Sequence, residues 1–316
     1  MSLFQVVVTE ATDQGEGNRA LRLEPVFEPL PPFAAGAHVD VHLPGGLVRQ
    51  YSIASDPAAH DHYLLCVKRE PDSRGGSRHL HEQLGPGHRL WISAPRNLFA
   101  LQPQGPHLLL AAGIGITPLL SMAQALEARG EPFVLHYYVH APAQAAFAER
   151  LRAGFAHGRV ELHASSAGES PRRHVPEELM QAAGHLYLCG PNAFMDRFSA
   201  LATAHGWRGD QVHREHFAGT ASGPQPGDTA FEVELASTGE VVEVAADTTI
   251  AQALAAAGVP LPVSCEQGIC GACLTRVVAG TPDHRDAVMS AAEHAANTRI
   301  TPCCSRSRSP RLVLDL

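Results

Sequence analysis

A group of cysteines near the end of the sequence has the spacing of an iron–sulfur site. The stretch CEQGICGACLTR places Cys265, Cys270 and Cys273 in one short loop, and Cys303 follows after 29 further residues, with Cys304 beside it. The spacing C-x4-C-x2-C with a distant fourth cysteine is typical of plant-type [2Fe–2S] proteins, whose cluster is held by four thiolates. Glycines within the loop let the backbone fold closely around such a cluster and bring its N–H groups near the sulfur atoms.

Two other interpretations of these cysteines explain the pattern less well. A structural zinc site normally pairs two short-spaced cysteine knuckles, whereas this chain has one such loop and a single distant position. Buried free cysteines would not require three thiols within nine positions, interleaved with glycine. The residues alone leave Cys303 and Cys304 open as the fourth ligand. On an expected strand after ITP their side chains would point to opposite sides, so that only one faces the cluster.

The elements that must position this loop change in character along the chain. Residues 1–102 show short alternating patterns such as HVDVHL and HYLLCVKRE, with a helical pattern at SRHLHEQL, and these predict a small antiparallel β-barrel in which Cys66 is a core residue. Residues 103–224 alternate strands such as HLLLAAG, RVELHAS and HLYLCGP with helical stretches such as TPLLSMAQALEARG and AQAAFAERLRAG. This alternation predicts an α/β domain with a doubly wound parallel sheet.

The last part of the chain follows a segment, AGTASGPQPGDTA, that has the composition of a linker. Residues 227–316 begin with FEVELASTGEVVEV, which predicts a hairpin that turns near Gly239. TTIAQALAAAG predicts a short helix with Thr248 or Thr249 as its N-cap. RLVLDL predicts a final strand, so the cysteine loop is expected to lie within a small α+β domain.

The whole chain resembles the phthalate dioxygenase reductase and vanillate O-demethylase reductase family. CEQGICGACLTRVVAGTPDHRD, the ending SRSRSPRLVLDL and separate motifs in each third of the chain carry the resemblance. It implies an FMN-binding barrel at 1–102, an NAD-binding domain at 103–224 and a β-grasp ferredoxin domain at 227–316. The family's Cys-x-Ser-Arg pattern selects Cys303 as the fourth cluster ligand and leaves Cys304 as a core residue.

The barrel contains a stretch, Arg49-Gln50-Tyr51-Ser52, that is similar to the R-x-Y-S pattern of flavin-binding barrels in this superfamily. Arg49 can pair with a phosphate, and Tyr51 offers a flat face to a flavin ring. Ser52 offers a hydroxyl or N–H group near the ring nitrogen that accepts hydride. Without the resemblance, the stretch would also suit an ordinary strand with an exposed Arg and a half-buried Tyr.

A second stretch of the barrel supports the flavin interpretation. In Arg74-Gly75-Gly76-Ser77, glycines precede a serine that we expect to cap a short helix, and such an arrangement suits an anion. By itself it would equally suit a plain turn and cap. The resemblance favours FMN over FAD, a distinction that the residues themselves leave open because both flavins share the ring system and first phosphate.

The middle part of the chain begins with a glycine loop, AAGIGITP, which joins a strand to a helix. Gly113 and Gly115 suit a dinucleotide pyrophosphate, with Thr117 expected as N-cap and Pro118 at the first helical position. The loop is similar to the G-G-I-G-I-T-P loop of the ferredoxin-reductase superfamily, and Ala112 stands where that family often has glycine. A methyl group at this position could crowd the cofactor.

Two further stretches lie at predicted strand ends of this part. Cys189-Gly190-Pro191-Asn192 is similar to C-G-P motifs that place a cysteine beside nicotinamide, although a lone Cys189 would also suit a small core residue. In HREHF, Glu215 and Phe217 match the family's Glu-x-Phe, whose ring covers the flavin. Phe217 would otherwise be a core residue that follows the last strand. Ser52, Cys189, Glu215 and Phe217 are thus the expected residues at the reacting atoms.

The combination implies an order of electron transfer. NADH donates two electrons as hydride and a [2Fe–2S] cluster accepts one, so a flavin must stand between them. The resemblance implies NADH as donor and a Rieske-type terminal oxygenase as acceptor. The strand FVLHYYVH ends without an acidic residue for the ribose, and Arg150, Arg152, Arg172 and Arg173 follow it, which leaves NADPH open. Other acceptors, such as a cytochrome P450 or a di-iron hydroxylase, and a non-catalytic electron carrier are the alternatives.

Composition excludes several other classes. The 24 basic and 32 acidic residues give a net charge of −8, which disfavours nucleic acid as a partner. No apolar run is long enough to cross a bilayer, and MSLFQVVVTE has the pattern of a strand and lacks that of a signal peptide. We therefore expect a cytoplasmic monomer whose clustered cysteines serve metal or redox chemistry.

Overall fold

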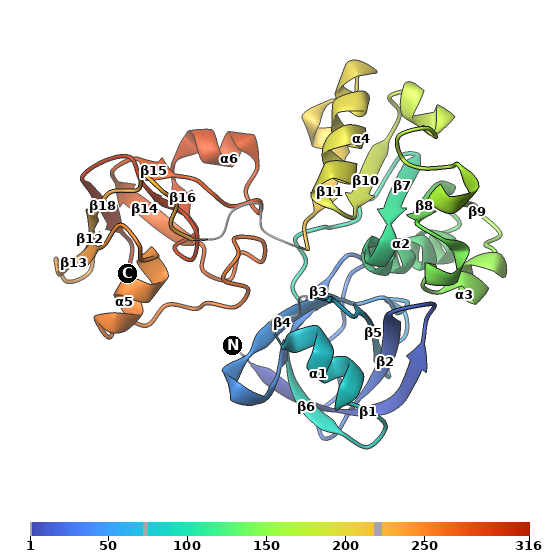
Figure 1. The fold of residues 1–316 in the computed structure, drawn as a ribbon, viewed down its shortest axis with the longest axis horizontal. Coiled ribbons are helices and arrows are strands. Elements are labelled where there is room, and N and C mark those ends of the chain that lie inside the picture. Colours follow the sequence, from blue (N-terminus) through green and yellow to red (C-terminus); the bar gives the residue numbers. More distant parts are fainter. Residues whose placement is uncertain (1, 72–74, 218–222) are drawn as a thin grey trace. The chain divides into compact units, whose positions relative to one another are not determined.

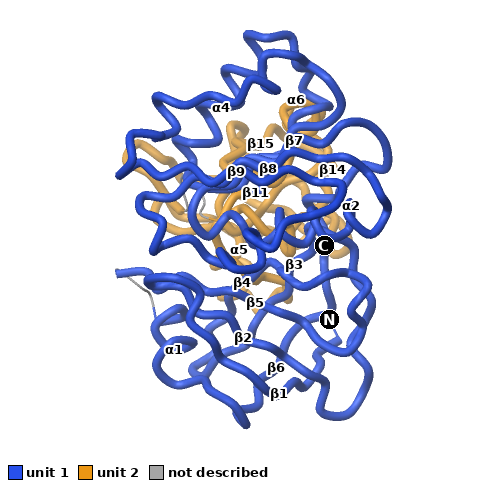
Figure 2. The backbone as a smooth tube through the Cα atoms, turned by 90° about the vertical axis from the view of Figure 1, so that its right-hand side faces the viewer, with its two compact units in different colours: residues 1–215 blue, residues 216–316 orange. Residues whose placement is uncertain are grey.

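The computed structural model describes residues 2–71, 75–217 and 223–316. Over these residues the chain forms two compact units, Met1–Glu215 and His216–Leu316, which are shown in different colours in Figure 2. Within the same residues, no helix combines the length and apolar character needed to span a membrane. The finer division at 102/103 stays a prediction, because the first unit contains both of the first two predicted domains.

The N-terminal part of the first unit is an antiparallel barrel (Figure 1). Among the described residues its sheet has the strand order β4-β3-β6-β1-β2-β5. The strands are β1 (Leu3–Asp13), β2 (Asn18–Pro25), β3 (His38–His42), β4 (Val48–Ser52), β5 (Tyr63–Lys68) and β6 (Arg89–Ser93). An antiparallel bridge between Ile53 and Leu65 joins the two outer strands and closes the barrel. Alternate residues such as Val6 and Val8 fill its interior, which confirms the predicted barrel.

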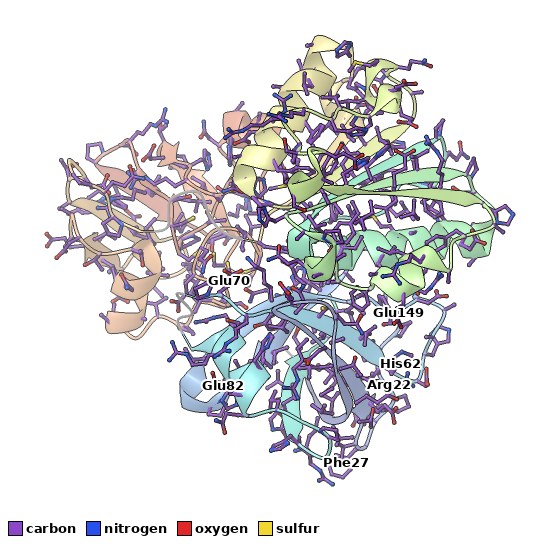
Figure 3. The ribbon with its side chains drawn as sticks, turned by 45° about the vertical axis from the view of Figure 1, so that its right-hand side comes forward. Arg22, Phe27, His62, Glu70, Glu82 and Glu149 are labelled. Atoms are coloured by element: carbon purple, nitrogen blue, oxygen red, sulfur yellow. The ribbon has the colours of Figure 1, made fainter. Side chains whose placement is uncertain are left out.

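The outer surface of the barrel is polar and carries ion pairs (Figure 3). Arg22 lies 2.8 Å from Asp61, and Arg69 lies 2.7 Å from Glu82 at the end of α1 (Gly76–Glu82). Phe27 projects from the tip of the barrel (Figure 3) and is 77% exposed. Exposed pairs of this kind contribute little to stability, so the apolar interior of the barrel maintains its shape.

The second half of the first unit is a parallel sheet with helices on both faces (Figure 1). Its strand order in the described residues is β11-β10-β7-β8-β9, and each neighbouring pair is parallel. The strands are β7 (His107–Ala112), β8 (Phe133–Val139), β9 (Gly158–Ala164), β10 (His185–Cys189) and β11 (Val212–Glu215). Leu109 and Ala111 pack with α2 (Ile116–Arg129), whereas Leu108 and Leu110 pack with α4 (Asn192–Ala204). The continuous apolar run of β7 is therefore buried on both sides, which confirms the predicted parallel sheet.

One predicted helix of this domain is shorter than expected. The sequence predicts a helix through AQAAFAERLRAG, but α3 spans only Ala148–Arg152. Phe147 adopts a left-handed conformation, with φ of 58°, and this backbone setting separates α3 from the preceding residues. The expectation was wrong because an alanine-rich pattern does not reveal that Phe147 enters the core.

In the described residues, the second unit has a mixed sheet and two short helices (Figure 1). In the part that the structure describes, the strand order of this sheet is β13-β12-β18-β14-β16. β12 and β18 are parallel, and the other neighbouring strands are antiparallel. The elements are β12 (Phe231–Leu235), β13 (Val241–Val244), α5 (Ile250–Ala256), β14 (Thr275–Ala279), β15 (Pro282–Asp283), α6 (Ala291–Ala296), β16 (Arg299–Ile300), β17 (Arg306–Ser307) and β18 (Arg311–Leu314). Gly239 lies in the turn of the hairpin, with φ of 74°, as expected. Thr249, of the two predicted candidates, is the N-cap of α5 and accepts a 3.2 Å hydrogen bond from the Gln252 N–H.

Candidate functional site

The cysteine loop and the distant cysteines meet in one buried cluster. Cys265, Cys270, Cys273 and Cys303 are each at most 8% exposed. The Sγ atoms of Cys273 and Cys303 lie 3.3 Å apart, and the thiol of Cys265 interacts with those of Cys270 and Cys303. Four thiols from two segments therefore converge, with Cys265 and Cys270 forming one pair and Cys273 and Cys303 the other. This donor set suits a [2Fe–2S] cluster.

Backbone N–H groups of the loop are directed at the sulfur atoms. The N–H of Gln267 donates to Sγ of Cys265 over 3.3 Å, and the N–H of Cys265 donates to Sγ of Cys270 over 3.5 Å. Gly268 allows this close folding: its φ is 70°, and a Cβ atom would lie 2.5 Å from Sγ of Cys304. Only glycine fits there without a shift of the neighbouring chain. Such N–H···S contacts stabilise negative charge on the sulfur atoms.

The structure distinguishes Cys303 from Cys304 by their surroundings. Sγ of Cys303 lies 3.3 Å from Sγ of Cys273, whereas Sγ of Cys304 lies against Gly268 of the loop and 3.3 Å from Oγ1 of Thr301. The strand expected here is wrong, because Thr301 accepts backbone hydrogen bonds from Cys304 and Ser305 and makes this segment a turn. Pro302, which lacks an N–H group, favours the turn over a strand. The turn, rather than strand alternation, therefore sets the positions of the two thiols.

An ion-pair network lies behind the cysteine segment. Arg285 contacts Asp228 at 2.5 Å and Asp283 at 2.8 Å, and Arg306 lies 3.4 Å from Asp228. The guanidinium of Arg306 is buried and donates to the carbonyls of Thr248 and Ala245. The stretch SRSRS is basic, as a surface patch would be, but Arg306 is buried. Its hydrogen bonds attach β17, the strand after Cys303, to the segment before α5.

In the barrel, the structure brings together two of the stretches predicted to bind a flavin phosphate. Gly76 packs against the side chain of Arg49: an added Cβ atom would lie 2.7 Å from Cγ of Arg49. The expected capping role of Ser77 is wrong, because Gly75 is the N-cap and Ser77 Oγ instead accepts from the N–H of Glu70. Arg74 lies outside the described residues. The absence of a side chain on Gly76 therefore lets the Arg49 side chain pack directly on the backbone at the start of α1.

The two halves of the first unit meet at Ser52 and Glu215. Ser52 ends β4, Glu215 ends β11, and the Ser52 hydroxyl donates a 3.2 Å hydrogen bond to Oε2 of Glu215. Burial raises the pKa of Glu215 to about 8, opposed by the hydrogen bond from Ser52. Burial also raises the pKa of Tyr51, which pairs with Val39 in the sheet and packs on the barrel core. Ser52 and Glu215 thus form a protonatable pair between the barrel and the parallel sheet.

The glycine loop of the parallel sheet lies directly against Cys189. A Cβ atom on Gly115 would be 2.2 Å from the carbonyl oxygen of Cys189, so the loop and the end of β10 approach closely. Gly113 has φ of 55° and is exposed, with open space where a Cβ atom would lie. Thr117 does not cap α2 as expected, because a 3-10 turn at Gly113–Gly115 starts the helical path earlier. Pro118 is the third residue of α2 and not the first as expected, but it still lies in the first turn, where a missing N–H group breaks no intrahelical hydrogen bond.

Cys189, the last residue of β10, and the residues that follow it provide further close packing. Cys189 is completely buried, and burial raises the pKa of its thiol well above the ordinary value. Gly190 packs on Ala112, since a Cβ atom there would lie 2.7 Å from the Ala112 methyl. The methyl group of Ala112 therefore packs directly on Gly190, where the ends of β7 and β10 lie side by side. Pro191 is the N-cap of α4 and Asn192 its first residue. Asp196 forms a 2.6 Å surface ion pair with Arg214.

Phe217, the last of the residues expected at the reacting atoms, follows β11 and is 39% exposed. It belongs to the second unit together with His216. The flavin is expected to bind to the first unit, whereas Phe217 is counted with the second. The position of Phe217 over a flavin therefore stays a prediction.

An open pocket of about 950 Å³ lies beside β9 and α4. It is lined by Ser165 and Arg172 from the segment after β9 and by Phe194 and Arg197 from α4. Arg197 donates to the carbonyls of Pro171 and Arg172, which holds that segment against α4. The sequence indicated Arg172 as one of four candidates for a nucleotide phosphate. It missed Ser165 and Arg197, which come together only through the packing of α4 on the sheet.

The antiparallel barrel, the parallel sheet with its glycine loop and the four-thiol cluster define a multidomain iron–sulfur oxidoreductase. Residues 233–308 match the family model of the 2Fe-2S iron-sulfur cluster binding domain. The chain is also 50% identical over 290 residues to the vanillate O-demethylase oxidoreductase of Pseudomonas sp. (strain HR199 / DSM 7063), covering 91% of each. The chain therefore belongs to the vanillate O-demethylase oxidoreductase family, and it is a reductase component of the oxygenase and demethylase type.

Solved structures agree with this assignment. Phthalate dioxygenase reductase, described as a modular structure for electron transfer from pyridine nucleotides to [2Fe-2S], is 33% identical with a TM-score of 0.72 over all of this chain and 98% of its own. An intact type IV self-sufficient cytochrome P450 monooxygenase matches 99% of this chain at 35% identity, with a TM-score of 0.88. The match covers 41% of that longer chain. The electron-transfer fold is thus also similar to part of a larger enzyme.

Proposed function

We propose that this reductase accepts hydride from NADH on FMN and passes single electrons through a [2Fe–2S] cluster to a Rieske-type terminal oxygenase or O-demethylase. The observation that carries the proposal is the convergence of four buried thiols, from the loop 265–273 and from Cys303, in a chain that also has a barrel and a parallel sheet. A flavin bound between donor and cluster would accept the electron pair and release electrons one at a time.

Cys265, Cys270, Cys273 and Cys303 are the proposed cluster ligands. Their burial excludes bulk water from the site, and the N–H groups of Gln267 and Cys265 already point at sulfur. These contacts favour negative charge on the thiolates and so adjust the reduction potential. Cys304 has its own partner in Thr301 and has no role as a ligand in this proposal.

The barrel residues are proposed to bind the flavin. Arg49, packed on Gly76, would neutralise the phosphate, with Gly75 and Ser77 beside it. Tyr51 would lie against the ring, and Ser52 would offer its backbone N–H group near the hydride-accepting nitrogen, because its hydroxyl donates to Glu215. Because Ser52 is already held by Glu215, its hydroxyl is oriented before any cofactor binds.

The parallel sheet is proposed to bind the nicotinamide nucleotide. A pyrophosphate would bind at the glycine loop, where Gly113 is exposed and has open space around it. Thr117, at the start of α2, is proposed to belong to the same site. Gly190, Pro191 and Asn192 would line the nicotinamide end of the site together with Cys189. The thiol of Cys189 stays protonated because burial raises its pKa, so it would shape the site and take no part as a nucleophile. Phe217 is proposed to cover the flavin ring until nicotinamide replaces it.

The acceptor has a second candidate. The similarity to part of a self-sufficient cytochrome P450 supports a haem protein as an alternative recipient of electrons. Residues 227–316 carry 11 acidic and 6 basic residues, a net charge of −5, which would favour an acceptor with a basic docking face in either case. An NADPH- or FAD-dependent form of the same reaction is the remaining alternative.

The test is a combined analysis of cofactors and turnover in the full-length protein. Flavin released by heat should co-migrate with FMN, and the same sample should contain about two iron atoms per chain. NADH should reduce cytochrome c through the protein, and Cys270→Ser should abolish this one-electron route while leaving flavin reduction by NADH intact. Absence of both flavin and iron from the isolated protein would refute the proposal. A preference for NADPH or the release of FAD would select the alternative.

A further inference from the structure

Two buried histidines on neighbouring strands of the parallel sheet turn their rings toward each other. His136 on β8 is 2% exposed and His163 on β9 is 4% exposed. Nδ1 of His136 lies 2.9 Å from Nε2 of His163. Oε2 of Glu161 lies 3.4 Å from the first of these nitrogens and 3.8 Å from the second. Because Glu161 is the strand partner of His136, the three side chains share one face of the sheet.

The three atoms have the spacing of ligands around a metal ion. In a tetrahedral site with nitrogen and oxygen ligands at about 2.0–2.1 Å, neighbouring ligand atoms lie about 3.3–3.4 Å apart. The measured separations of 2.9, 3.4 and 3.8 Å fall on both sides of that value. An ion could therefore bind here with only small side-chain adjustments.

The outer nitrogens of both rings have carboxylate partners. Nε2 of His136 lies 3.2 Å from Oε2 of Glu178, and Nδ1 of His163 lies 3.5 Å from Oε2 of Glu169. If each outer nitrogen donates its proton to its carboxylate, both inner nitrogens carry lone pairs. Those lone pairs then face each other and a third acceptor, Glu161, with no donor among them. Metal-binding histidines commonly have such a carboxylate on the second nitrogen, because it fixes the tautomer that leaves the first nitrogen free for the ion.

The charge around the rings also suits a divalent cation. Glu161, Glu169 and Glu178 surround the two imidazoles, and Arg159 contacts both Glu161 and Glu178. With neutral imidazoles, three carboxylates and one guanidinium leave a net charge of −2. Arg159 is 55% exposed and pairs from the solvent side, so it does not occupy the space between the rings.

We propose that His136, His163 and Glu161 bind a divalent transition-metal ion, zinc by preference, with water as a fourth ligand. Two imidazoles, one carboxylate and water form a ligand set that zinc accepts in a tetrahedral arrangement. The ion is separate from the cysteine cluster and has a structural role. It ties β8 to β9 and, through Glu169, fixes the segment that carries Ser165 and Arg172 of the adjacent pocket.

The same sheet provides a matched control. Nδ1 of His185 lies 3.1 Å from Nε2 of His213, on the neighbouring strands β10 and β11. Within the described residues, neither of these rings forms an ion pair with a carboxylate. This pair therefore has the same ring-to-ring contact as His136 and His163 but lacks the carboxylate partners, and it should not bind zinc.

The test uses the full-length protein with its native cofactors. After treatment with EDTA and desalting, the protein is dialysed against about 10 µM ZnCl₂, and zinc and iron are measured in the same sample by mass spectrometry. We expect about one zinc per chain in the wild type and in His213→Gln. His163→Gln and Glu161→Gln should lose it. Bound zinc should also raise the thermal midpoint of the wild type and leave that of His163→Gln unchanged.

Further variants keep the proposal testable if a ligand variant fails to fold. Glu178→Gln and Glu169→Gln retain all three ligands and should weaken zinc binding about 10–100-fold. His294→Gln removes a member of a separate group, His284, Asp286 and His294, in the second unit and should retain zinc. The proposal is overturned if the wild type takes up no zinc, if His163→Gln and Glu161→Gln bind as much as the wild type, or if only His294→Gln loses the ion.

Discussion

The hydroxyl of Ser52 donates a 3.2 Å hydrogen bond to the carboxyl of Glu215, across 163 positions of sequence. Ser52 is the last residue of a barrel strand and Glu215 the last residue of a strand in the parallel sheet. The bond therefore links the part proposed to bind flavin with the part proposed to bind nicotinamide. A single proton on Glu215 changes the charge at this junction.

That proton predicts a pH dependence. Burial raises the pKa of Glu215 to about 8, so the carboxyl is mostly protonated at neutral pH. The pre-steady-state rate of flavin reduction by NADH should show an inflection near pH 8, and Glu215→Gln should remove it. Ser52→Ala removes a hydrogen bond that favours the ionised carboxyl, so the inflection should move to higher pH. Identical profiles in the wild type and Glu215→Gln would show that this carboxyl does not control the step.

The raised pKa of Glu215 also predicts that the free energy of unfolding falls as the pH rises. Between the ordinary value of 4.5 and the folded value of about 8, the folded chain binds more protons at this residue than the unfolded chain. The contribution of Glu215 to stability is therefore largest below about pH 4.5 and is lost as the pH rises through 8. Glu215→Gln should lose less stability than the wild type between pH 7 and 9, as measured by urea unfolding.

The two adjacent cysteines predict opposite outcomes on substitution. Cys303→Ser removes a thiol that lies 3.3 Å from Sγ of Cys273 and should lose the iron and the red-brown absorbance. Cys304→Ser places a hydroxyl next to Oγ1 of Thr301, where it can still hydrogen-bond, and should retain both. Iron content and the electron paramagnetic resonance of the reduced protein measure this difference. The reverse pattern would reassign the fourth ligand.

The close approach at Gly115 predicts a steric penalty. In Gly115→Ala the new methyl group would lie 2.2 Å from the carbonyl oxygen of Cys189, a backbone atom that cannot move aside as a flexible side chain could. We expect destabilisation by about 1–3 kcal/mol, typical of overpacking, with a weaker affinity for the nucleotide. Gly209→Ala is the matched control, since nothing lies within 4 Å of its added Cβ atom. Equal thermal midpoints for both variants would contradict the packing described here.

The ion pairs around Asp228 predict sensitivity of the second unit to acid. Hydrogen bonding from Arg285 lowers the pKa of Asp228 from 3.8 to about 2. Its stabilising contribution is present above pH 3.8 and is lost as the pH falls through 2. At neutral pH, Asp228→Asn should cost about 1.5–3 kcal/mol, because the guanidinium loses a charged acceptor. Glu234→Gln, whose carboxylate pairs with the partly exposed Arg311, should change the thermal midpoint little.

The pocket beside α4 predicts an effect on nucleotide choice. Arg172 lines it together with Ser165 and Arg197, and a 2′-phosphate would meet positive charge there. Arg172→Ala should raise the KM for NADPH at least tenfold and change the KM for NADH much less, because NADH lacks that phosphate. Arg150→Ala, on the separate helix α3, is the control. Equal loss with both nucleotides would mean that Arg172 contacts a group common to them.

The sequence predicted the parts of this fold that depend on local pattern. The apolar run of HLLLAA and the alternation of strands with helices were sufficient for the parallel sheet, because every residue of β7 is buried. The sequence narrowed the cap of α5 to Thr248 or Thr249, and the structure selects Thr249. Thr117 and Ser77 were wrong as caps because a preceding 3-10 turn and a glycine, respectively, start those helices earlier.

What the sequence could not predict depends on contacts between distant segments. The turn at Thr301 forms because the N–H groups of Cys304 and Ser305 both donate to the Thr301 carbonyl. No pattern in the sequence predicts this turn or distinguishes Cys303 from Cys304. In the sequence, His136 and His163 are single polar residues in two predicted strands, and nothing there indicates that they meet. Only the register of β8 on β9 places both beside Glu161 and gives them a shared role. The bond between Ser52 and Glu215 likewise requires the packing of the two halves of the first unit.

The position of β18 in its sheet affects the order in which the second unit is made. This strand lies between β12 and β14, yet it is synthesised after all of the cysteines. On the ribosome, the thiols of the loop 265–273 and of Cys303 therefore emerge before the strand that completes their supporting sheet. Insertion of iron should accordingly follow the emergence of β18, and the nascent thiols pass through an interval in which oxidants and other metals can reach them.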